Sequence, residues 1–511
     1  MKLSVLTDKL AIEATTALDN WGDPQIKALC YDSRKVTPGS LFIAIQGLSV
    51  NGHGFIDQAV DRGAVAVVCE QPTEAEVAVL QVADSRAALA QLACRFYGYP
   101  ADAMTLVGVT GTNGKTTVTY LLEQILKKAG HQPGVVGTIN YRYDGNVFDN
   151  PVTTPESLEL QAILREMADA GVTHAVMEVS SHALDLHRVD GCRYDMAVFT
   201  NLTQDHLDHH GDMDRYWACK RSMFTNYLRP ADADHPLRAV VNADDPKGSE
   251  LFHILGDQCL RTAAYGQGDI LPVAVIRDLT GIRGSIATPQ GEIPFSSSLV
   301  GDFNVENILS AAGAALALNV PVGAIAAGIE ATACVPGRLE RIAAGGTHTI
   351  FVDYAHTPDA LENAITALRT LTPSRLITVF GCGGDRDNSK RPIMGQIAAR
   401  LSDLAVVTSD NPRSEDPLKI IAEVEAGVRR IIGQRLSPEA LKSGWQGKAY
   451  VVEPDRLAAI AVAIHAADRS DAVLIAGKGH ETYQILADET IHFDDREAAR
   501  HVLAAVGQAG A

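Results

Sequence analysis

Val107-Gly-Val-Thr-Gly-Thr-Asn-Gly-Lys-Thr-Thr117 is the stretch that decides the fold of this chain. An apolar, β-branched run at 104–109 leads into it and a helical pattern at 116–127 follows, which gives the order strand, glycine loop, helix. Such a loop directs successive N–H groups and a helix N-terminus at one point. We therefore expect it to bind the phosphates of ATP or GTP, with Lys115 against the β/γ oxygens and the Thr116 hydroxyl on Mg²⁺. The loop residues expected to bind the nucleotide are Gly111, Thr112, Asn113, Gly114, Lys115, Thr116 and Thr117.

One position departs from the strict phosphate-loop pattern G-x-x-x-x-G-K-[ST]. Val109 stands where that pattern has glycine, and Gly108 lies one position early. An ordinary glycine turn is the alternative. The Gly-Lys-Thr-Thr run favours the phosphate loop, because it lies between a strand and a helix as the mechanism requires.

Length and composition limit the class of protein. A chain of 511 residues is too long for one core, and we expect about three domains. Hydrophobic residues make up 46%, and the net charge of −18 argues against a general nucleic-acid binder. None of the eight cysteines belongs to a C-x-x-C pair, and the N-terminal segment before Asp8 has no sustained apolar core. We expect a cytoplasmic protein with neither a disulfide framework nor a zinc cluster nor a secretory signal.

The segment 308–329 contains 22 residues without a charge, which is long enough for a membrane span. It consists mostly of alanine and glycine, and Asn319-Val-Pro321 interrupts it. Two short buried helices are therefore the favoured interpretation.

Polar residues follow the predicted strands of the central region. The strand at 174–179 carries Glu178 at its carboxyl end, where open α/β sheets bind ligands, and a carboxylate buried there needs a cation such as Mg²⁺. The strand at 195–200 runs into Asn201-Leu-Thr-Gln-Asp-His-Leu-Asp-His-His210. That cluster matches neither H-E-x-x-H nor a Cys/His finger, so we expect one of its residues to reach the nucleotide metal and no dedicated zinc site.

A second parallel α/β region begins after Pro336-Gly-Arg-Leu-Glu340. Polar loops follow most of its strands, and their convergence on one carboxyl edge would form a binding crevice. Gly477-Lys-Gly479 lacks the spacing of a phosphate loop, so we expect a turn that presents His480 and Glu481. The predicted strands are 348–353, 375–381, 404–410, 448–453 and 472–477, the first beginning at His348.

Eight motifs along the chain resemble, in their order, those of the Mur ligases of peptidoglycan synthesis. The resemblance covers essentially the full length, and no single motif carries it alone. The motifs are Gly-Thr-Asn-Gly-Lys-Thr-Thr117, Met-Glu-Val-Ser-Ser-His182, Asn-Leu-Thr-Gln-Asp-His-Leu-Asp-His-His-Gly211, Phe-Asn-Val-Glu-Asn307, Pro-Gly-Arg-Leu-Glu340, Asp-Tyr-Ala-His-Thr-Pro358, Asp-Asn-Pro-Arg413 and Gly-Lys-Gly-His-Glu481.

The resemblance implies an α/β protein of three domains. These are a small N-terminal α/β domain for a UDP sugar at 1–97, a central phosphate-loop ATPase with a mainly parallel sheet at 98–335, and a C-terminal Rossmann-like domain for an amino acid at 336–511. It also implies ATP-dependent ligation of meso-2,6-diaminopimelate to UDP-N-acetylmuramoyl-L-alanyl-D-glutamate through an acyl phosphate, in cell wall biogenesis. We expect a monomer with small-molecule substrates and with neither nucleic-acid nor membrane partners.

The same resemblance assigns roles to single residues. Lys115, His206 and Lys220 are catalytic, and Thr116, Glu178, His206 and Lys220 hold Mg²⁺, with Lys220 carbamylated by CO₂. From the sequence alone, a helical lysine such as Lys220 is more often a solvated surface cation. Asn304, Arg338 and Asp353 border the ATP. The UDP-muramoyl dipeptide binds Tyr31, which stands where relatives can carry an aliphatic residue, together with Ser33, Thr153, Thr154, Ser180 and Arg188.

Diaminopimelate is expected to bind Arg386, Asp410, Asn411, Pro412, Arg413, Gly477 and Glu481. A guanidinium pairs bidentately with a carboxylate, so Arg413 would recognise the carboxylate that diaminopimelate has and lysine lacks. Pro412 would stiffen the loop, and Glu481 suits an ammonium group.

Two other functions stay open from the sequence. One is a ligase such as folylpolyglutamate synthetase, against which Asp-Ser-Arg34 and Asp-Asn-Pro-Arg413 argue. The other is a nucleotide-hydrolysing switch, which would not need a C-terminal crevice lined by Arg386, Arg413 and Glu481.

Overall fold

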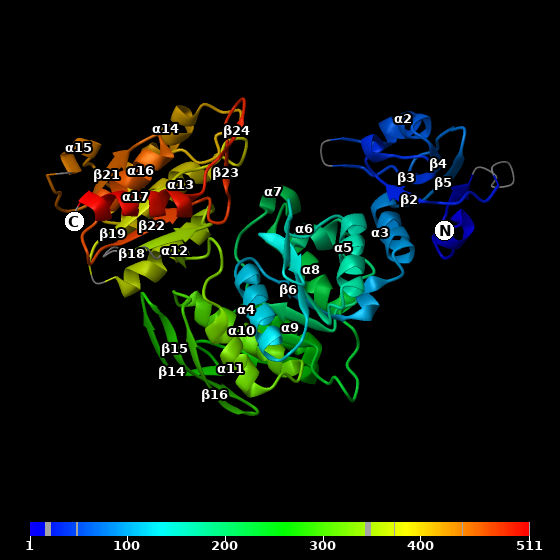
Figure 1. Ribbon diagram of the computed structural model, residues 1–511, viewed down its shortest axis with the longest axis horizontal. Helices are drawn as coiled ribbons and strands as arrows, with labels where there is room; N and C mark the ends of the chain where they lie inside the picture. Colours follow the sequence, from blue (N-terminus) through cyan, green and yellow to red (C-terminus); the bar gives the residue numbers. More distant parts are fainter. Residues whose placement is uncertain (16–21, 48–49, 343–348, 373, 442, 510–511) are drawn as a thin grey trace. The chain divides into compact units, whose positions relative to one another are not determined.

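The chain forms two compact units in a computed structural model (Figure 1). One unit consists of residues 1–261 and 313–321, and the other of residues 262–312 and 322–511. The structure describes residues 1–15, 22–47, 50–342, 349–372, 374–441 and 443–509. The domain bounds predicted from the sequence stay a prediction.

A small mainly parallel sheet forms the N-terminal part of the first unit. Its strand order is β1-β5-β4-β3-β2, in which β1 pairs antiparallel with β5 and the other pairs are parallel. Alternate residues of β4 face opposite cores, since Val68 packs with the core of α3 and Val67 with that of α2. The elements are α1 (Leu3–Thr7), β1 (Ala14–Thr15), β2 (Ala28–Cys30), β3 (Ser40–Ile43), α2 (Ile56–Asp61), β4 (Ala64–Cys69), β5 (Ala78–Gln81) and α3 (Ser85–Phe96).

An eight-stranded sheet follows in the order β13-β12-β11-β6-β10-β7-β8-β9. Strands β12, β11, β6, β10 and β7 pair in parallel, as the sequence predicted, whereas the hairpin β8–β9 adds antiparallel pairs that it did not predict. The strands are β6 (Thr105–Thr110), β7 (Pro133–Val136), β8 (Asn140–Tyr143), β9 (Asn146–Asp149), β10 (His174–Glu178), β11 (Met196–Phe199), β12 (Ala239–Asn242) and β13 (Cys259–Thr262).

Helices cover this sheet and leave its carboxyl edge for loops. Leu106 and Met177 share a core with Leu160 and Leu164 of α5, while α4 packs against β6, β7 and β10. Because β6, β10 and β11 are parallel neighbours, the loops after them meet at one edge. The helices are α4 (Lys115–Lys128), α5 (Ser157–Asp169), α6 (Ser181–Asp185), α7 (Leu207–His210), α8 (Met213–Ser222) and α9 (Pro246–Leu255).

The mainly parallel sheet expected for residues 98–335 does not extend to the end of that region. A three-stranded antiparallel sheet of β14 (Leu271–Asp278), β15 (Gly281–Thr288) and β16 (Gly291–Ser297) lies there. The uncharged segment 308–329 forms parts of two helices, α10 (Phe303–Ala317) and α11 (Val322–Ala331), as predicted. Most of α10 is buried, but α11 buries only one side, so the prediction of two buried helices was right for α10 alone.

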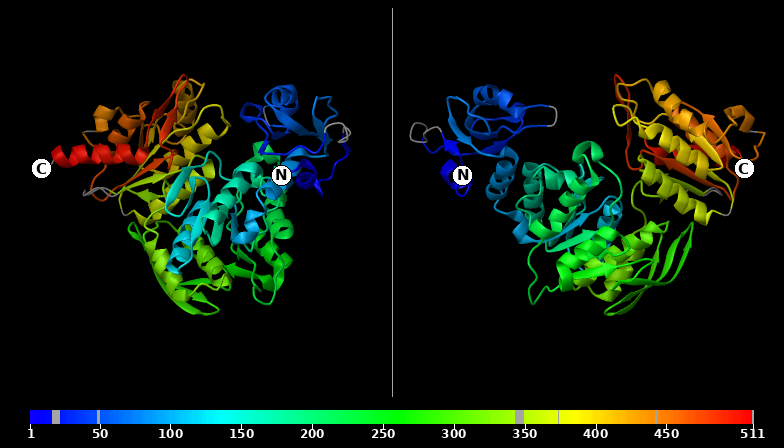
Figure 2. Two further views of the ribbon diagram at one scale, coloured as in Figure 1. Left: turned by 45° about the vertical axis from the view of Figure 1, so that its right-hand side comes forward. Right: turned by 180° about the vertical axis from the view of Figure 1, so that it is seen from behind.

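The second unit is built on a six-stranded sheet in the order β17-β18-β22-β19-β20-β21, parallel from β18 to β21 (Figures 1 and 2). Phe351 packs with the core of α12, α13 and α14, whereas Ile350 and Val352 pack with that of α16 and α17. All five predicted strands are present, although His348 lies outside the described residues. The strands are β17 (Glu340–Arg341), β18 (Thr349–Asp353), β19 (Leu376–Phe380), β20 (Leu404–Val407), β21 (Ala449–Val452) and β22 (Ala472–Ala476). The helices and the final hairpin are α12 (Pro358–Leu371), α13 (Lys390–Leu401), α14 (Pro417–Val428), α15 (Pro438–Leu441), α16 (Arg456–Ala466), α17 (Asp495–Ala509), β23 (Tyr483–Ile485) and β24 (Thr490–His492).

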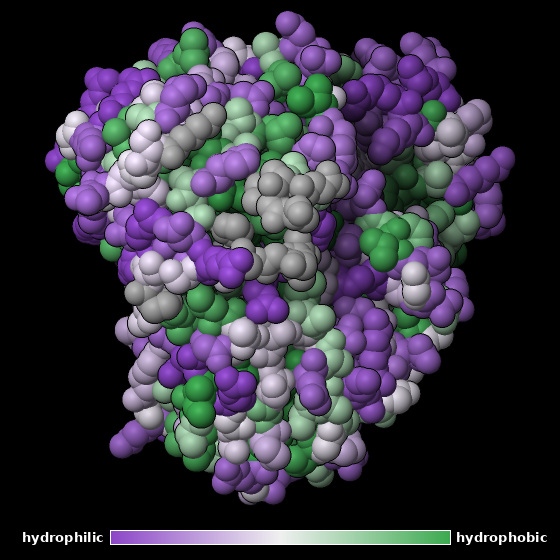
Figure 3. Space-filling model, turned by 60° about the vertical axis from the view of Figure 1, so that its left-hand side comes forward, coloured by the Kyte–Doolittle hydropathy of each residue, from purple (hydrophilic) through white to green (hydrophobic). Residues whose placement is uncertain are grey.

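On the face drawn in Figure 3, hydrophilic and hydrophobic residues are interspersed. Within the described ranges, no helix has the length and apolar content needed to cross a membrane.

Candidate active site

The glycine loop between β6 and α4 adopts a backbone that only glycine tolerates at two positions. Gly111 has φ 147° and Gly114 has φ 87°, and a Cβ at Gly111 would overlap the hydroxyl of Thr200. The loop is fixed by the residues after β11, since the Thr112 and Asn113 N–H groups donate to Asn201, each over 2.9 Å. The loop is therefore preset by neighbouring strands.

Glu178 is buried at the carboxyl end of β10, as the sequence predicted. The Thr116 hydroxyl donates to its Oε2 over 3.1 Å. Thr138, which sequence analysis missed, donates its N–H to Oε1 over 2.9 Å and its hydroxyl to Oε2 over 2.8 Å. A carboxylate and a hydroxyl in contact beside a phosphate loop are a fitting pair of oxygen ligands for Mg²⁺. The available signal for Thr138 was its position just after β7, at the same edge of the sheet.

Two lysine amines share one carbonyl oxygen at this loop. The Nζ atoms of Lys115 and Lys220 both donate to the Gly111 oxygen, over 2.9 and 2.7 Å. Lys220 is only 1% exposed, and its Nζ lies 4.6 Å from the centre of the Tyr216 ring. Burial and the charge of Lys115 hold the pKa of Lys220 well below its usual value. Lys220 is thus a buried amine whose lowered pKa favours the neutral form, and the prediction of a solvated surface lysine from the sequence alone was wrong.

His206 lies at the N-terminus of α7 with a positive φ of 54°. Burial lowers the pKa of its imidazole, as does the nearby charge of Lys115, against the opposing charge of Asp205. The lowered pKa of His206 favours its neutral imidazole, and the neutral imidazole is the form that binds a metal.

Four of the residues expected to bind the muramoyl dipeptide gather beside Glu178. The Thr154 hydroxyl donates to the Glu178 carbonyl over 2.8 Å, and the Thr153 hydroxyl lies 3.1 Å from that of Thr138. Ser180 donates its N–H to Thr154, and Arg188 donates to the Thr154 carbonyl over 3.0 Å. These hydroxyl and guanidinium groups are suited to a carboxylate that is to be phosphorylated.

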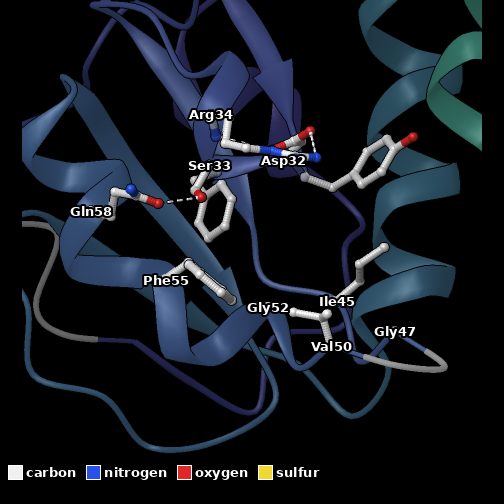
Figure 4. A pocket seen from close by; sticks show the side chains of 11 residues that line it. Asp32, Ser33, Arg34, Ile45, Gly47, Val50, Gly52, Phe55 and Gln58 are labelled. Carbon is white, nitrogen blue, oxygen red and sulfur yellow. Dashed lines mark hydrogen bonds and ion pairs between the residues drawn. The ribbon is translucent and has the colours of Figure 1, made fainter. Parts of the chain in front are cut away.

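The other two residues expected to bind the UDP-muramoyl dipeptide, Tyr31 and Ser33, line a pocket of about 470 Å³ in the N-terminal sheet region (Figure 4). The Ser33 hydroxyl donates to Gln58 over 2.6 Å, and Phe42 and Phe55 contribute apolar surface. Gln58 and Phe55 were not predicted, because only the fold brings α2 and the turn before it to the strand that precedes Ser33.

The start of α5 links this pocket region to the phosphate-loop region. The Tyr31 hydroxyl donates to Glu159 over 2.9 Å, and Glu156 pairs with Arg86 over 2.9 Å and with Arg188 over 3.5 Å. The residues expected for the nucleotide sugar thus fall into two groups, as a long ligand with a nucleoside at one end and a carboxylate at the other would need.

In the second unit, the residues expected to bind diaminopimelate follow three adjacent parallel strands. Asn411, after β20, joins the loops: its Nδ2 donates to Glu481 over 2.9 Å and its Oδ1 accepts from Lys478 over 3.1 Å. Lys478, which was not predicted as a site residue, is fully buried and also pairs with Glu481 over 3.2 Å and with Asp410 over 3.9 Å. The predicted turn is present, with Gly477 at φ 120° and Gly479 at φ 54°.

Arg413 has a positive φ of 53°, and its Nη1 donates to the Gly384 carbonyl over 2.9 Å. Gly384 in turn donates its N–H to the Asn411 carbonyl over 2.9 Å, so the loops after β19 and β20 hold each other. Pro412 is buried, and Arg386, on the β19 loop, is exposed.

Behind these loops, Arg456 forms a fully buried ion pair with Asp495 over 2.7 Å. Its guanidinium also donates to the carbonyls of Ser409 and Ala476, over 3.2 and 3.0 Å, which lie just before Asp410 and Gly477. Arg456 therefore fixes the starting points of two site loops. Its contacts reach backbone carbonyls, which no sequence motif reveals.

The three residues expected beside ATP from the later part of the chain belong to the second unit. Asn304 is buried and donates to Val300, and Arg338 lies over the Tyr354 ring. Asp353 accepts from the N–H groups of Leu339 and Ala355, and burial raises the pKa of its carboxyl. Their contact with the nucleotide stays a prediction.

Family models match most of the chain. Residues 25–97 match the Mur ligase family catalytic domain, residues 109–315 the Mur ligase middle domain, and residues 337–479 the Mur ligase glutamate ligase domain. The chain belongs to the Mur ligase family. This Mur ligase has the α/β, three-domain architecture that its sequence predicted.

Individual relatives are similar over nearly their full length. The chain is 46% identical to the UDP-N-acetylmuramoyl-L-alanyl-D-glutamate–2,6-diaminopimelate ligase of Geobacter metallireducens, covering 95% of this chain and 96% of that one. It is 47% identical to the ligase of the same name from Geobacillus thermodenitrificans, covering 94% and 95%. A solved structure of a ligase with this name matches this Mur ligase with a TM-score of 0.66 at 31% identity, covering 94% and 95%.

Proposed function

We propose that this Mur ligase joins meso-2,6-diaminopimelate to UDP-N-acetylmuramoyl-L-alanyl-D-glutamate with cleavage of ATP to ADP and phosphate. The observation that carries the proposal is the set of joined loops around Asn411, because the Asn411 amide donates to Glu481 and the Arg413 guanidinium, two residues further along the same loop, donates to Gly384. The names of relatives 46–47% identical to the chain support the same substrates. They also favour this function over a folylpolyglutamate synthetase or a nucleotide switch.

The first chemical step is transfer of the γ-phosphoryl group of ATP to the γ-carboxylate of the glutamate. Such a transfer needs positioning and charge neutralisation rather than a protein nucleophile. We assign the phosphates to the loop N–H groups and Lys115. We assign the carboxylate to Thr153, Thr154, Ser180 and Arg188, which lie beside Glu178.

We assign Mg²⁺ to Thr116, Glu178, His206 and Lys220. Mg²⁺ there would neutralise the phosphate oxygens that carry the developing charge. The contact between Thr116 and Glu178 and the neutral imidazole of His206 support the assignment. Carbamylation requires a neutral amine, and Lys220 fits that requirement because it is buried beside Lys115. The carbamate would convert this amine into a carboxylate-like oxygen donor.

The second step is attack of an amine of diaminopimelate on the acyl phosphate, with loss of phosphate. We assign the far carboxylate of the amino acid to Arg413 and an ammonium to Glu481. Lysine lacks that carboxylate and would bring an ammonium close to the guanidinium, so the loop rejects it by a lost attraction and a repulsion.

The test is a turnover assay with purified protein that follows phosphate release and product mass. Phosphate release should require the UDP-muramoyl dipeptide and a diamino acid together. The kcat/KM for meso-diaminopimelate should be much higher than the kcat/KM for L-lysine. Lys115→Ala should abolish turnover and keep the fold. Phosphate release without either acceptor, or equal use of both amino acids, would contradict the proposal.

A further inference from the structure

A second group of metal-binding side chains lies on α6, α7 and α8, outside the set assigned to Mg²⁺. Asp185 ends α6, His209 and His210 end α7, and Cys219 lies in α8. One ligand atom from each of Asp185, His209 and His210 lies within 4.8 Å of the other two. Both α6 and α7 contact α8, and Figure 1 shows the three helices near one another.

Two of the separations between the ligand atoms are close to those of a four-coordinate metal site. Cys219 Sγ lies 3.6 Å from Asp185 Oδ1 and 3.8 Å from His210 Nδ1. In a tetrahedral zinc site, bonds of about 2.0–2.3 Å place neighbouring ligand atoms roughly 3.3–3.6 Å apart. His209 Nε2 lies 2.7 Å from Asp185 Oδ2, which is a hydrogen-bond distance. That contact must widen for both atoms to bind one ion, and the Asp185 side chain is 44% exposed and able to turn.

His210 is already oriented as a metal ligand would be. Its side chain is buried, and its Nε2 lies 2.9 Å from the Ser181 hydroxyl. An Nε2–H that donates to this hydroxyl leaves Nδ1 with a lone pair, and Nδ1 is the atom that faces Cys219. Metal-binding histidines characteristically use one ring nitrogen for the metal and the other for such a hydrogen bond.

We propose that Asp185, His209, His210 and Cys219 bind a divalent cation of the zinc class, separately from the Mg²⁺ of the ligase reaction. Two imidazoles and a thiolate select zinc-like ions over Mg²⁺, which prefers oxygen ligands. When the metal–sulfur bond forms, the S–H bond of Cys219 breaks and its proton leaves to solvent. The site contains no residue assigned to phosphate, Mg²⁺ or amino-acid binding.

The sequence argued against a zinc site because the His-rich run at 201–210 matches no zinc motif. Two of the four proposed ligands, Asp185 and Cys219, come from outside that run. Without a metal, Cys219 would be held only by its hydrogen bonds to Asp185 and His210. Both would be weak, because a thiol is a poor hydrogen-bond donor. The folded helices therefore supply a donor set that sequence spacing does not reveal.

Cobalt substitution tests the site in the full-length protein without turnover. Metal-free protein in excess Mg²⁺ is titrated with Co²⁺ and its absorption is recorded. We expect a thiolate-to-cobalt charge-transfer band and the intense visible bands of tetrahedral Co²⁺. Both signals should saturate at one equivalent of Co²⁺ per protein, and addition of Zn²⁺ should abolish both. Cys219→Ser should lose the charge-transfer band, whereas Cys334→Ser, at an exposed cysteine of the other unit, should keep it.

Asp185→Asn and His209→Phe provide a second measurement, because each changes one ligand and leaves the sulfur in place. Each should weaken Zn²⁺ binding, measured by competition with a chelating dye, by roughly 10-fold or more. Absence of the charge-transfer band in the parent protein, or its persistence in Cys219→Ser, would overturn the proposal. Ligase activity is not part of the readout, so failure of this site and failure of the proposed function are distinguishable.

Discussion

Among the residues that the structure describes, two lysines are almost completely buried, one in each compact unit, and they differ in what surrounds them. Lys220 is 1% exposed and Lys478 is 0% exposed. The Lys220 amine contacts a carbonyl oxygen and the Tyr216 ring, and within the residues that the structure describes it has no ion pair. The Lys478 amine lies between the carboxylates of Glu481 and Asp410.

This difference separates a chemical role from a structural one. Burial and a second lysine beside the Lys220 amine lower its pKa, and the neutral form of an amine is the form that reacts with an electrophile such as CO₂. An amine between two carboxylates supplies a positive charge that keeps those groups together. Burial alone therefore does not identify a functional lysine, and the partners of the amine decide its role.

The largest expected effect is on stability at Lys478. Lys478→Met leaves the buried Asp410 and the partly buried Glu481 without their cation, so the free energy of unfolding should fall by about 3–5 kcal/mol. Urea unfolding measures the loss, and hydrogen exchange should locate it at 404–416 and 477–485. Lys220→Met is the matched control and should cost little stability, because it removes a buried amine that has no ion pair. Equal losses in the two variants would remove the distinction.

The next effect is on catalysis at Lys220. Lys220→Ala should lower kcat roughly 10²- to 10³-fold, as expected for loss of a charge-stabilising group, while the fold is retained. Short carboxylic acids should restore part of the activity by supplying the missing oxygen donor. Lys128→Ala, at an exposed lysine of α4, is the control. A Lys220→Ala enzyme as active as the parent would refute the assignment.

A smaller effect is expected for substrate affinity at Arg413. Arg413→Ala removes a charged hydrogen-bond donor, worth about 1.5–3 kcal/mol, so the KM for diaminopimelate should rise roughly 10- to 100-fold. The KM for ATP should stay nearly unchanged, as should both values in Arg430→Ala, at an exposed arginine of the same unit. A parallel rise in the KM for ATP would show that the loop has a general structural role.

The smallest effect concerns pH. The unfolded chain holds a proton on Lys220 up to a pKa of about 10.4, whereas burial and the charge of Lys115 lower the pKa of Lys220 well below this value in the folded chain. Unfolding therefore takes up a proton, and the free energy of unfolding rises with pH across this window, by at most about 1.4 kcal/mol per pH unit. Between pH 7 and 9 in CO₂-free buffer, the parent should gain stability relative to Lys220→Met. Identical pH dependences would show that the folded lysine keeps its proton.

The sequence predicted the parts of the molecule that depend on local pattern. The strand, loop and helix around Lys115, the carboxylate at the end of β10 and the five C-terminal strands follow from hydrophobic runs and glycine positions. Residues that act through contacts between distant segments were not predictable in this way. Thr138 donates to Glu178 across neighbouring strands, and Arg456 reaches the carbonyls before two loops. The antiparallel strands β14–β16 were not predicted, because many of their residues are half-exposed and the strands lack a continuous apolar run.

Helix α10 has a consequence for the order in which the chain folds during synthesis. Its C-terminal part, with the buried Ala314 and Ala315, belongs to the first unit. Residues 262–312, which lie between the two segments of the first unit in the sequence, belong to the second unit. The ribosome must therefore synthesise residues 262–312 of the second unit and then residues 313–321 before the first unit is complete. A fragment ending at residue 261 would lack residues 313–321 of this unit, so we expect its independent expression to need a chain that extends to residue 321.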